Sequence, residues 1–177
     1  MCITTLEALR TRRAICRFKK EPVPDELIEK LLEAARCSPS SINSQPWELI
    51  VVTNPDTKAN ISRSFVIGPF LRETPLAIVV AINRLKSPLP VQDGSLAAYS
   101  IWLAAHDLEM GACWVNPTIP FGIKLTLGIP FNLKLVSVLA IGYSDETPMH
   151  STKKLEDFVF LKNTVIKKVK LRFQSDS

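Results

Sequence analysis

Residues 39–47 read PSSINSQPW and join two segments of different pattern. Before them, residues 25–36 place apolar side chains every three or four positions, which predicts an amphipathic helix that ends before Pro39. After them, residues 47–53 (WELIVVT) are typical of a strand. The polar stretch therefore predicts a loop between a helix and a strand, with hydroxyl and amide groups that can bind a flat heteroaromatic ligand. The alternative is an ordinary turn whose Ser and Asn side chains bond their own backbone.

The rest of the chain alternates helical and extended patterns without a strict strand-helix-strand rhythm. Residues 76–83 (LAIVVAIN) are apolar without alternation, which predicts a central strand buried on both faces. Further expected elements are a short helix capped by Thr4 or Thr5, a weak helix to about residue 65, a long helix over 94–110, strands over 113–116 and 135–143, and a short helix over 118–127. We also expect a mobile loop at residues 84–92 and a partly helical tail from Lys153 onward. This order predicts an α+β fold, with residues 1–177 forming a single domain.

Composition excludes several classes of protein. The chain has 177 residues, of which 46% are hydrophobic, but no uncharged apolar run reaches the roughly 18 residues that span a bilayer. The N-terminal residues do not resemble a signal peptide, so we expect a soluble cytoplasmic protein without a membrane partner. The four cysteines and two histidines are scattered, so neither a disulfide framework nor a metal site is expected. Cys37 and Cys113 are expected to be small core residues. Cys16 lies among arginines and is either a substitution without a chemical role or a redox-sensitive thiol.

The net charge of +5 is concentrated in two segments. Residues 10–20 contain several Lys and Arg and no acidic residue, and residues 150–177 contain more basic than acidic residues. These segments are either two solvated faces or two contributions of charge to one bound anion. Nucleic acid is not an expected partner, because the tail has few interleaved aromatic residues and its apolar residues are needed for packing.

The helix, the PSSINSQPW loop and the following apolar strand together resemble the signature of the nitroreductase family. Three further segments resemble the same family and occur in its order: RRAICRF at residues 12–18, GACW at residues 111–114 and LAIGY at residues 139–143. The resemblance therefore extends over most of the chain.

This resemblance implies a three-layer α/β/α fold with a mixed, mainly antiparallel sheet flanked by helices, and a C-terminal arm that extends to a partner subunit. It also implies a homodimer with FMN bound at the subunit interface. The expected activity is that of an FMN-dependent NAD(P)H oxidoreductase that reduces nitroaromatics, quinones or similar small acceptors by a ping-pong cycle. Since the flavin carries the chemistry, no catalytic side chain is assigned.

The cofactor-binding residues implied by the resemblance fall into four groups. The basic segment (residues 12–17), whose arginines would hold the phosphate or ribityl chain, contributes Arg12, Arg13, Ala14, Cys16 and Arg17. The loop, which would line the flavin and often that of the other subunit, contributes Pro39, Ser40, Ser41 and Asn43. The stretch after the 113–116 strand contributes Asn116 and Pro117, and the late basic position that closes on the phosphate is Lys153 or Lys154.

Several of these residues depart from the family pattern. Ala14 lacks a hydroxyl donor, Cys16 lacks a cation and Arg17 lies one place away from the position that would replace it. Pro117 has no N–H to offer the flavin. One lost charge-assisted hydrogen bond costs about 1.5–3 kcal/mol, so weaker FMN binding is expected. Two alternatives follow: a non-catalytic or weakly FMN-binding homologue with a regulatory role, or a specialised flavin reaction such as reductive dehalogenation or flavin breakdown.

Overall fold

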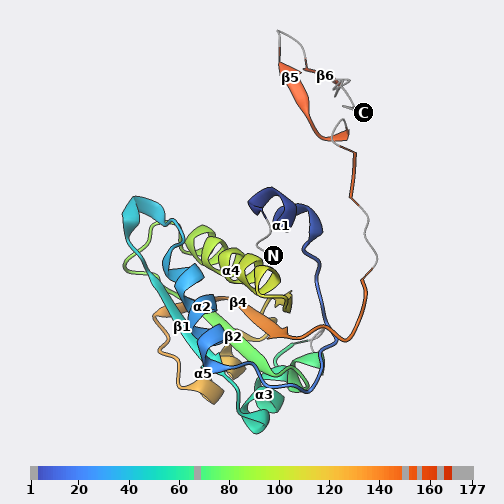
Figure 1. The fold of residues 1–177 in the computed structure, drawn as a ribbon. Helices are drawn as coiled ribbons and strands as arrows, with labels where there is room; N and C mark the ends of the chain where they lie inside the picture. Colours follow the sequence, from blue (N-terminus) through green and yellow to red (C-terminus); the bar gives the residue numbers. More distant parts are fainter. Residues whose placement is uncertain (1–3, 66–68, 149–151, 155–156, 163–165, 169–177) are drawn as a thin grey trace.

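The computed structural model describes residues 4–65, 69–148, 152–154, 157–162 and 166–168. A four-stranded sheet in the order β1-β2-β4-β3 lies at its centre (Figure 1). Its strands are β1 (Trp47–Val52), β2 (Leu76–Asn83), β3 (Gly111–Val115) and β4 (Leu133–Gly142). All three pairings are antiparallel. The apolar run of β2 is almost completely buried, as its pattern predicts, because helices cover both faces of the sheet.

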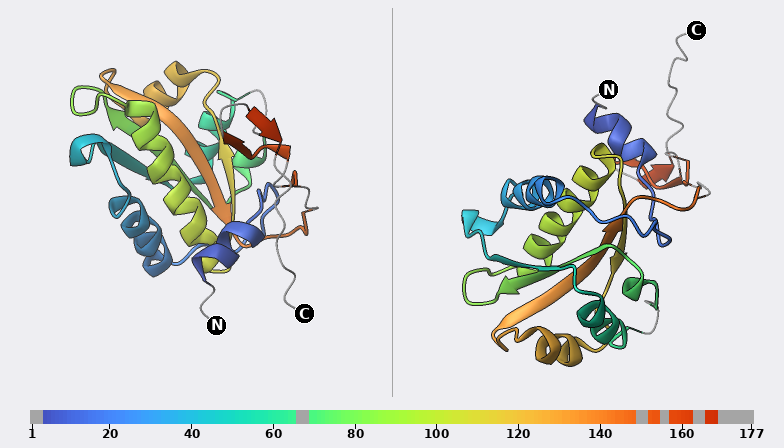
Figure 2. Two further views of the ribbon diagram at one scale, coloured as in Figure 1. Left: turned by 90° about the horizontal axis from the view of Figure 1, so that it is seen from above. Right: turned by 60° about the horizontal axis from the view of Figure 1, so that its bottom comes forward.

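Helices form the two outer layers. They are α1 (Thr5–Thr11), α2 (Asp25–Arg36), α3 (Pro55–Ser62), α4 (Pro90–Asp107) and α5 (Pro120–Leu127). In the right-hand view of Figure 2, α2 and α4 lie on one face of the sheet, whereas α3 and α5 lie on the other. Alternate residues of β2 accordingly enter two separate cores: Ile78 and Val80 pack toward α2 and α4, and Val79 and Ala81 toward α3 and α5. The three-layer α/β/α prediction is confirmed.

The chain between α1 and α2 lies along the β3 edge of the sheet. Ala14 forms a parallel bridge with Ala112, and the Ile15 N–H donates to the Ala112 carbonyl at 3.1 Å. The expected mixed, mainly antiparallel sheet is thus present, with this bridge as its parallel part. The approach is close because position 111 is glycine: a Cβ built on Gly111 would lie 2.6 Å from the Ile15 Cβ. Gly111 therefore makes room for the basic segment beside β3.

Replacing Gly111 by alanine is expected to lower the free energy of unfolding by about 1–3 kcal/mol. The added methyl meets the branch point of Ile15, which cannot rotate away, so the basic segment must move off β3. Urea unfolding of the variant measures this loss. Gly122→Ala is the matched control, since its added methyl lies 2.6 Å from the Ser64 hydroxyl, a group that can turn aside. Equal stability of the wild type and Gly111→Ala would contradict this close packing.

One expected boundary and the expected structure of the tail are wrong. The loop expected at residues 84–92 ends before Pro90, because α4 begins there and not at residue 94. Pro90 occupies the first turn, where a missing N–H costs nothing and the fixed φ of proline suits a helix. The tail, expected to be partly helical, instead forms β5 (Phe160–Lys162) and β6 (Ile166–Lys168), an antiparallel pair drawn apart from the main sheet in Figure 1. Phenylalanine and isoleucine in these segments favour strands.

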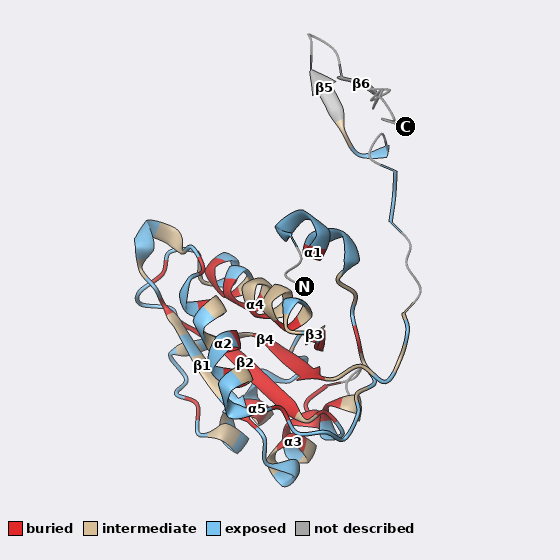
Figure 3. Ribbon diagram, in the orientation of Figure 1, coloured by how far each residue is buried: buried red, intermediate tan, exposed pale blue. Residues whose placement is uncertain are grey.

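Exposure varies strongly between the elements (Figure 3). The strands β2 and β4 are mostly buried, whereas α1 lies on the surface with Leu6 72% exposed. None of the helices in the described part of the chain has the length and apolar character required to cross a bilayer.

Candidate functional site

Arg12 packs its guanidinium group against two aromatic side chains of α4. Its Cζ lies 4.4 Å from the Trp102 ring centroid and 5.5 Å from that of Tyr99, which are cation-π distances. The Nε atom is buried and has no hydrogen-bond partner within the described chain. A buried donor without a partner costs about 1–3 kcal/mol of stability. An acceptor that is not among the described residues, such as a bound ligand, would remove this cost by accepting a hydrogen bond from Nε. A phosphate oxygen is such an acceptor.

The other two arginines of the basic segment are engaged with the protein itself. The Nη1 of Arg13 donates to the carbonyls of Arg10 at 2.8 Å and Arg12 at 2.6 Å. The Arg17 Nε lies 3.3 Å from Glu146 Oε2, and the Arg17 side chain is 72% exposed. Arg17 is therefore directed to Glu146 rather than to the position of Cys16. Ala14 is exposed and, as its side chain dictates, offers no donor.

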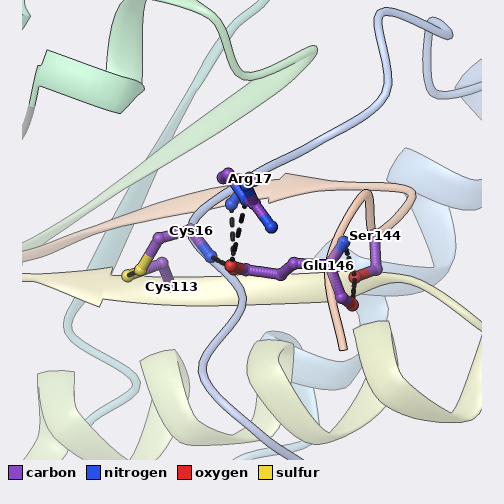
Figure 4. A network of polar contacts seen from close by, with 5 residues as sticks. All are labelled: Cys16, Arg17, Cys113, Ser144 and Glu146. Atoms are coloured by element: carbon purple, nitrogen blue, oxygen red, sulfur yellow. Dashed lines mark hydrogen bonds and ion pairs between the residues drawn. The ribbon is translucent and has the colours of Figure 1, made fainter. Parts of the chain in front are cut away.

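Glu146 is a residue of this region that the sequence did not single out. Its Oε1 accepts the backbone N–H of Cys16 at 2.6 Å and that of Arg17 at 3.0 Å (Figure 4). Ser144 fixes the turn, since its hydroxyl donates to the Glu146 carbonyl at 2.6 Å. The hydrogen bond from the Cys16 N–H is the main reason that the pKa of Glu146 lies below its usual value, although burial opposes the shift. Glu146 thus ties the basic segment to the chain that follows β4.

A cavity of about 400 Å³ brings together the basic segment and the end of β3. Its lining residues are Cys16, Phe65, Phe70, Cys113, Trp114, Val115, Asn116 and Thr118. Asn116 is exposed, and its Oδ1 accepts the Trp114 Nε1–H at 2.8 Å, which leaves the amide NH2 as a donor. Pro117 is half-buried beside it. Of the predicted site residues, Cys16 and Asn116 therefore share one cavity.

The PSSINSQPW loop has a strained backbone. Ile42, Asn43 and Gln45 have φ values of 51°, 53° and 44°, although none is glycine. For the β-branched Ile42 this left-handed conformation is unusual, and its cost is of the order of 1–3 kcal/mol. Burial does not offset that cost, because the Ile42 side chain is 86% exposed. Strain at an exposed position is characteristic of a functional loop, which favours the binding interpretation over an ordinary turn.

Asp93, in the first turn of α4, anchors this loop and was also missed by sequence reasoning. Its Oδ1 accepts the N–H of Ser41 at 2.8 Å and the Ser41 hydroxyl at 2.9 Å. Its Oδ2 accepts the Ser87 hydroxyl at 2.6 Å. Burial alone would raise the pKa of Asp93, which is 1% exposed, but these three hydrogen bonds outweigh it and the pKa lies below the usual value. Ser40 contributes within the loop by accepting the Gln45 N–H at 2.9 Å.

The structure does not bring the loop and the basic segment together within one chain. Ser41 is held at Asp93, whereas Arg12 contacts Trp102, and these α4 residues are about 13 Å apart along the helix axis. In Figure 1 the loop before β1 and the segment after α1 lie on opposite sides of α4. The exposed residues Pro39 and Asn43 belong to the first region. Lys153 and Lys154 are exposed residues beyond β4.

Comparisons with known proteins point to one family. The model of the Nitroreductase family matches residues 9–68 and 62–143. A Methanothermobacter thermautotrophicus protein, provisionally named an NADH dehydrogenase/NAD(P)H nitroreductase, is 38% identical over 81% of this chain and 78% of its own length. The structure of an FMN-dependent nitroreductase from Clostridium difficile R20291 is 31% identical with a TM-score of 0.84, covering 90% of this chain and 99% of that one. An iodotyrosine deiodinase of Thermotoga neapolitana is 26% identical over 77% of this chain and 87% of its length.

Proposed function

The chain belongs to the nitroreductase family, and from this premise we propose that it reduces nitroaromatics, quinones or similar small acceptors. It is a flavin-dependent oxidoreductase whose cofactor is FMN and whose electron donor is NAD(P)H. When bound, FMN supplies the two-electron chemistry between nicotinamide and acceptor, so the protein contributes binding, orientation and electrostatics. The observation that carries the proposal is the buried Nε of Arg12, which has no hydrogen-bond partner among the described residues.

Arg12 is the residue we assign to the FMN phosphate. Its guanidinium is fixed by Trp102 and Tyr99, so little rotamer freedom is lost when an anion binds. A phosphate oxygen would satisfy Nε with a charge-assisted hydrogen bond. We assign to the same anion the guanidinium nitrogens of Arg13 other than Nη1, and Lys153 or Lys154 would add charge from the tail. The residues present therefore fit the phosphate of FMN.

We assign the loop residues Pro39, Ser40, Ser41 and Asn43 to the flavin of a partner subunit. The support is geometric: the loop is rigidly anchored at Asp93, lies away from Arg12 of its own chain and exposes Ile42. A second copy of the chain would supply the missing half of each site. The protein is accordingly proposed to be a homodimer with the C-terminal arm extending over the partner.

The same residues support a moderate affinity for the cofactor. Arg17 is bound to Glu146, so it does not replace the cation that Cys16 lacks. Asn116 retains its amide donors beside the cavity, which offsets in part the absence of an N–H at Pro117. We expect FMN to bind reversibly and to dissociate when the protein is diluted.

A general reductase is favoured over the specialised reactions. The similarity to an iodotyrosine deiodinase leaves dehalogenation as the alternative on the same scaffold. The loop between β2 and α4 spans only residues 84–89, which leaves little chain for a lid that would enclose one particular substrate. We therefore propose that the cavity accepts several small electron acceptors rather than one.

The proposal predicts a yellow complex that nicotinamide bleaches. Protein mixed with FMN under anaerobic conditions should lose its visible flavin absorption when NADH or NADPH is added, and menadione or a nitroaromatic should restore it. The exposed Arg63 lies on α3's C-terminal cap, so Arg63→Ala serves as a control that should behave like the wild type. Absence of both bleaching and an FMN-induced thermal shift would reject the enzymatic proposal and favour a non-catalytic homologue.

A further inference from the structure

Two thiols that are far apart in the sequence meet beside the cavity. Cys16 belongs to the basic segment and Cys113 lies in β3, and their Sγ atoms are 2.7 Å apart (Figure 4). Within the described ranges, no group of three or more His, Cys, Asp or Glu side chains that could hold a metal ion is found. The sequence alone presented Cys16 as an isolated thiol and Cys113 as a core residue.

The backbone holds the two sulfurs in register. On one side of Cys16, the Ile15 N–H donates to the Ala112 carbonyl, the residue before Cys113. On the other side, Glu146 accepts the N–H groups of Cys16 and Arg17. Because the chain is held on both sides of Cys16, the backbone keeps positions 16 and 113 next to each other, so the two sulfurs are within reach of one another.

The two thiols have different surroundings. Cys16 is half-buried and lines the cavity, whereas Cys113 is 8% exposed. Burial raises the pKa of Cys113 above its usual value, and the hydrogen bond with Cys16 adds to the shift. Cys113 therefore keeps its proton and can donate it to the Cys16 sulfur. Because Cys16 is half-buried in the cavity wall and Cys113 is buried, Cys16 is the sulfur that an incoming oxidant meets first. As for any cysteine, the thiolate is the form that reacts.

We propose that Cys16 and Cys113 form a reversible redox site that hydroperoxides oxidise to an intramolecular disulfide. The Cys16 thiolate attacks one peroxide oxygen and the O–O bond breaks, giving a sulfenic acid and, after protonation, water. The Cys113 sulfur then attacks the sulfenic sulfur: the S–S bond forms, the S–O bond and the Cys113 S–H bond break, and the thiol proton leaves with the hydroxide as a second water. Two thiols are oxidised while one hydrogen peroxide becomes two water molecules, and an external dithiol reverses the change by exchange.

The disulfide would form with little movement. An S–S bond is about 2.05 Å long, so sulfurs at 2.7 Å need to approach by well under 1 Å. The bond would join the basic segment covalently to β3. Its chemistry requires only the two thiols and the oxidant, so it does not depend on the proposed reductase activity.

The full chain should therefore show a specific response to hydrogen peroxide. After a small molar excess of peroxide, alkylation and digestion, the four thiols of the wild type should fall to two, and one peptide pair should join Cys16 to Cys113. Dithiothreitol should restore all four. Closing this long loop should raise Tm by roughly 5–10 °C relative to the reduced protein. Cys37→Ser, which removes an exposed thiol elsewhere, is the matched control and should form the same peptide pair.

Variants that lack either cysteine should show neither the joined peptides nor the rise in Tm. Cys16→Ser and Cys113→Ser should give no such peptide pair and no rise in Tm after peroxide, and Cys113→Ala replaces Cys113→Ser if the buried hydroxyl impairs folding. The proposal is overturned if wild-type Cys16 proceeds to sulfinic or sulfonic acid while Cys113 remains alkylatable, or if Cys16 joins a second chain. Flavin bleaching by NADH, measured on the same sample, reports separately on the proposed function.

Discussion

Replacing Arg12 by alanine is expected to weaken FMN binding by roughly 10- to 100-fold, which corresponds to one lost charge-assisted hydrogen bond. The fold should survive the change. The variant loses the cation-π contacts with Trp102 and Tyr99, but it also removes the buried donor that has no partner among the described residues. These two effects on stability oppose each other, so Tm of the FMN-free protein should change little.

A comparison of FMN with riboflavin, which lacks the phosphate, tests the assignment directly. Titration calorimetry should show that Arg12→Ala loses affinity for FMN and keeps its affinity for riboflavin within about twofold. A twofold change in Kd corresponds to less than about 0.5 kcal/mol of binding free energy. Arg63→Ala should match the wild type for both ligands. If Arg12→Ala weakened FMN and riboflavin equally, Arg12 would contact the ring system or shape the cavity instead of binding the phosphate.

The sequence predicts best those elements whose position is decided by burial of their apolar residues alone. The expected bounds of β2 match the structure residue for residue, because an unbroken apolar run has no alternative to burial between two layers. The α2 prediction holds for a similar reason: its stripe places Ile28, Leu31 and Ala35 in the core. The start of α4 was missed because Pro90 is a breaker inside a helix but a favourable residue at its first turn. Local pattern does not distinguish these two roles of proline.

The site was predictable only in part. The strained loop and the basic segment are recognisable as motifs, yet the residues that fix them are not. Asp93 acts on Ser41, which lies 52 residues away, and Glu146 acts on Cys16 across 130 residues. Such contacts depend on the tertiary fold and leave no spacing to recognise. The Cys16–Cys113 pair is hidden for the same reason, because each thiol alone has an ordinary interpretation.

Replacing Asp93 by leucine should lower the free energy of unfolding by about 3 kcal/mol, since it leaves the Ser41 N–H and two serine hydroxyls without their acceptor in a buried place. For a chain of this length that loss corresponds to a decrease in Tm of roughly 6–12 °C. Asp107→Asn is the matched control, because Asp107 is an exposed carboxylate at the other end of α4 and should change stability little.

The pH dependence of the unfolding free energy tests whether the charge of the Asp93 carboxylate is what stabilises the loop. The folded pKa of Asp93 lies below its unfolded value, so its contribution to stability is present at neutral pH and is lost as the pH falls through the folded pKa. In Asp93→Asn, the amide oxygen still accepts from Ser41, but the charge is absent at every pH. The difference in unfolding free energy between the wild type and Asp93→Asn should therefore be about 1–2 kcal/mol at pH 7 and should shrink as the pH falls below about 4.

Subtracting the two stability curves removes the contribution of other acids, including Glu146, whose pKa is also lowered. A difference that stayed constant from pH 7 to acid would mean that the charge of Asp93 contributes nothing and that shape alone holds the loop.

The role of the loop in flavin binding can be measured separately. If Asp93 keeps Ser41 and its neighbours in the strained conformation that a partner's flavin requires, Asp93→Leu should weaken FMN and riboflavin alike, because the loop has no part in binding the phosphate. That result contrasts with the FMN-specific loss expected of Arg12→Ala, so the two variants together separate the two halves of the site.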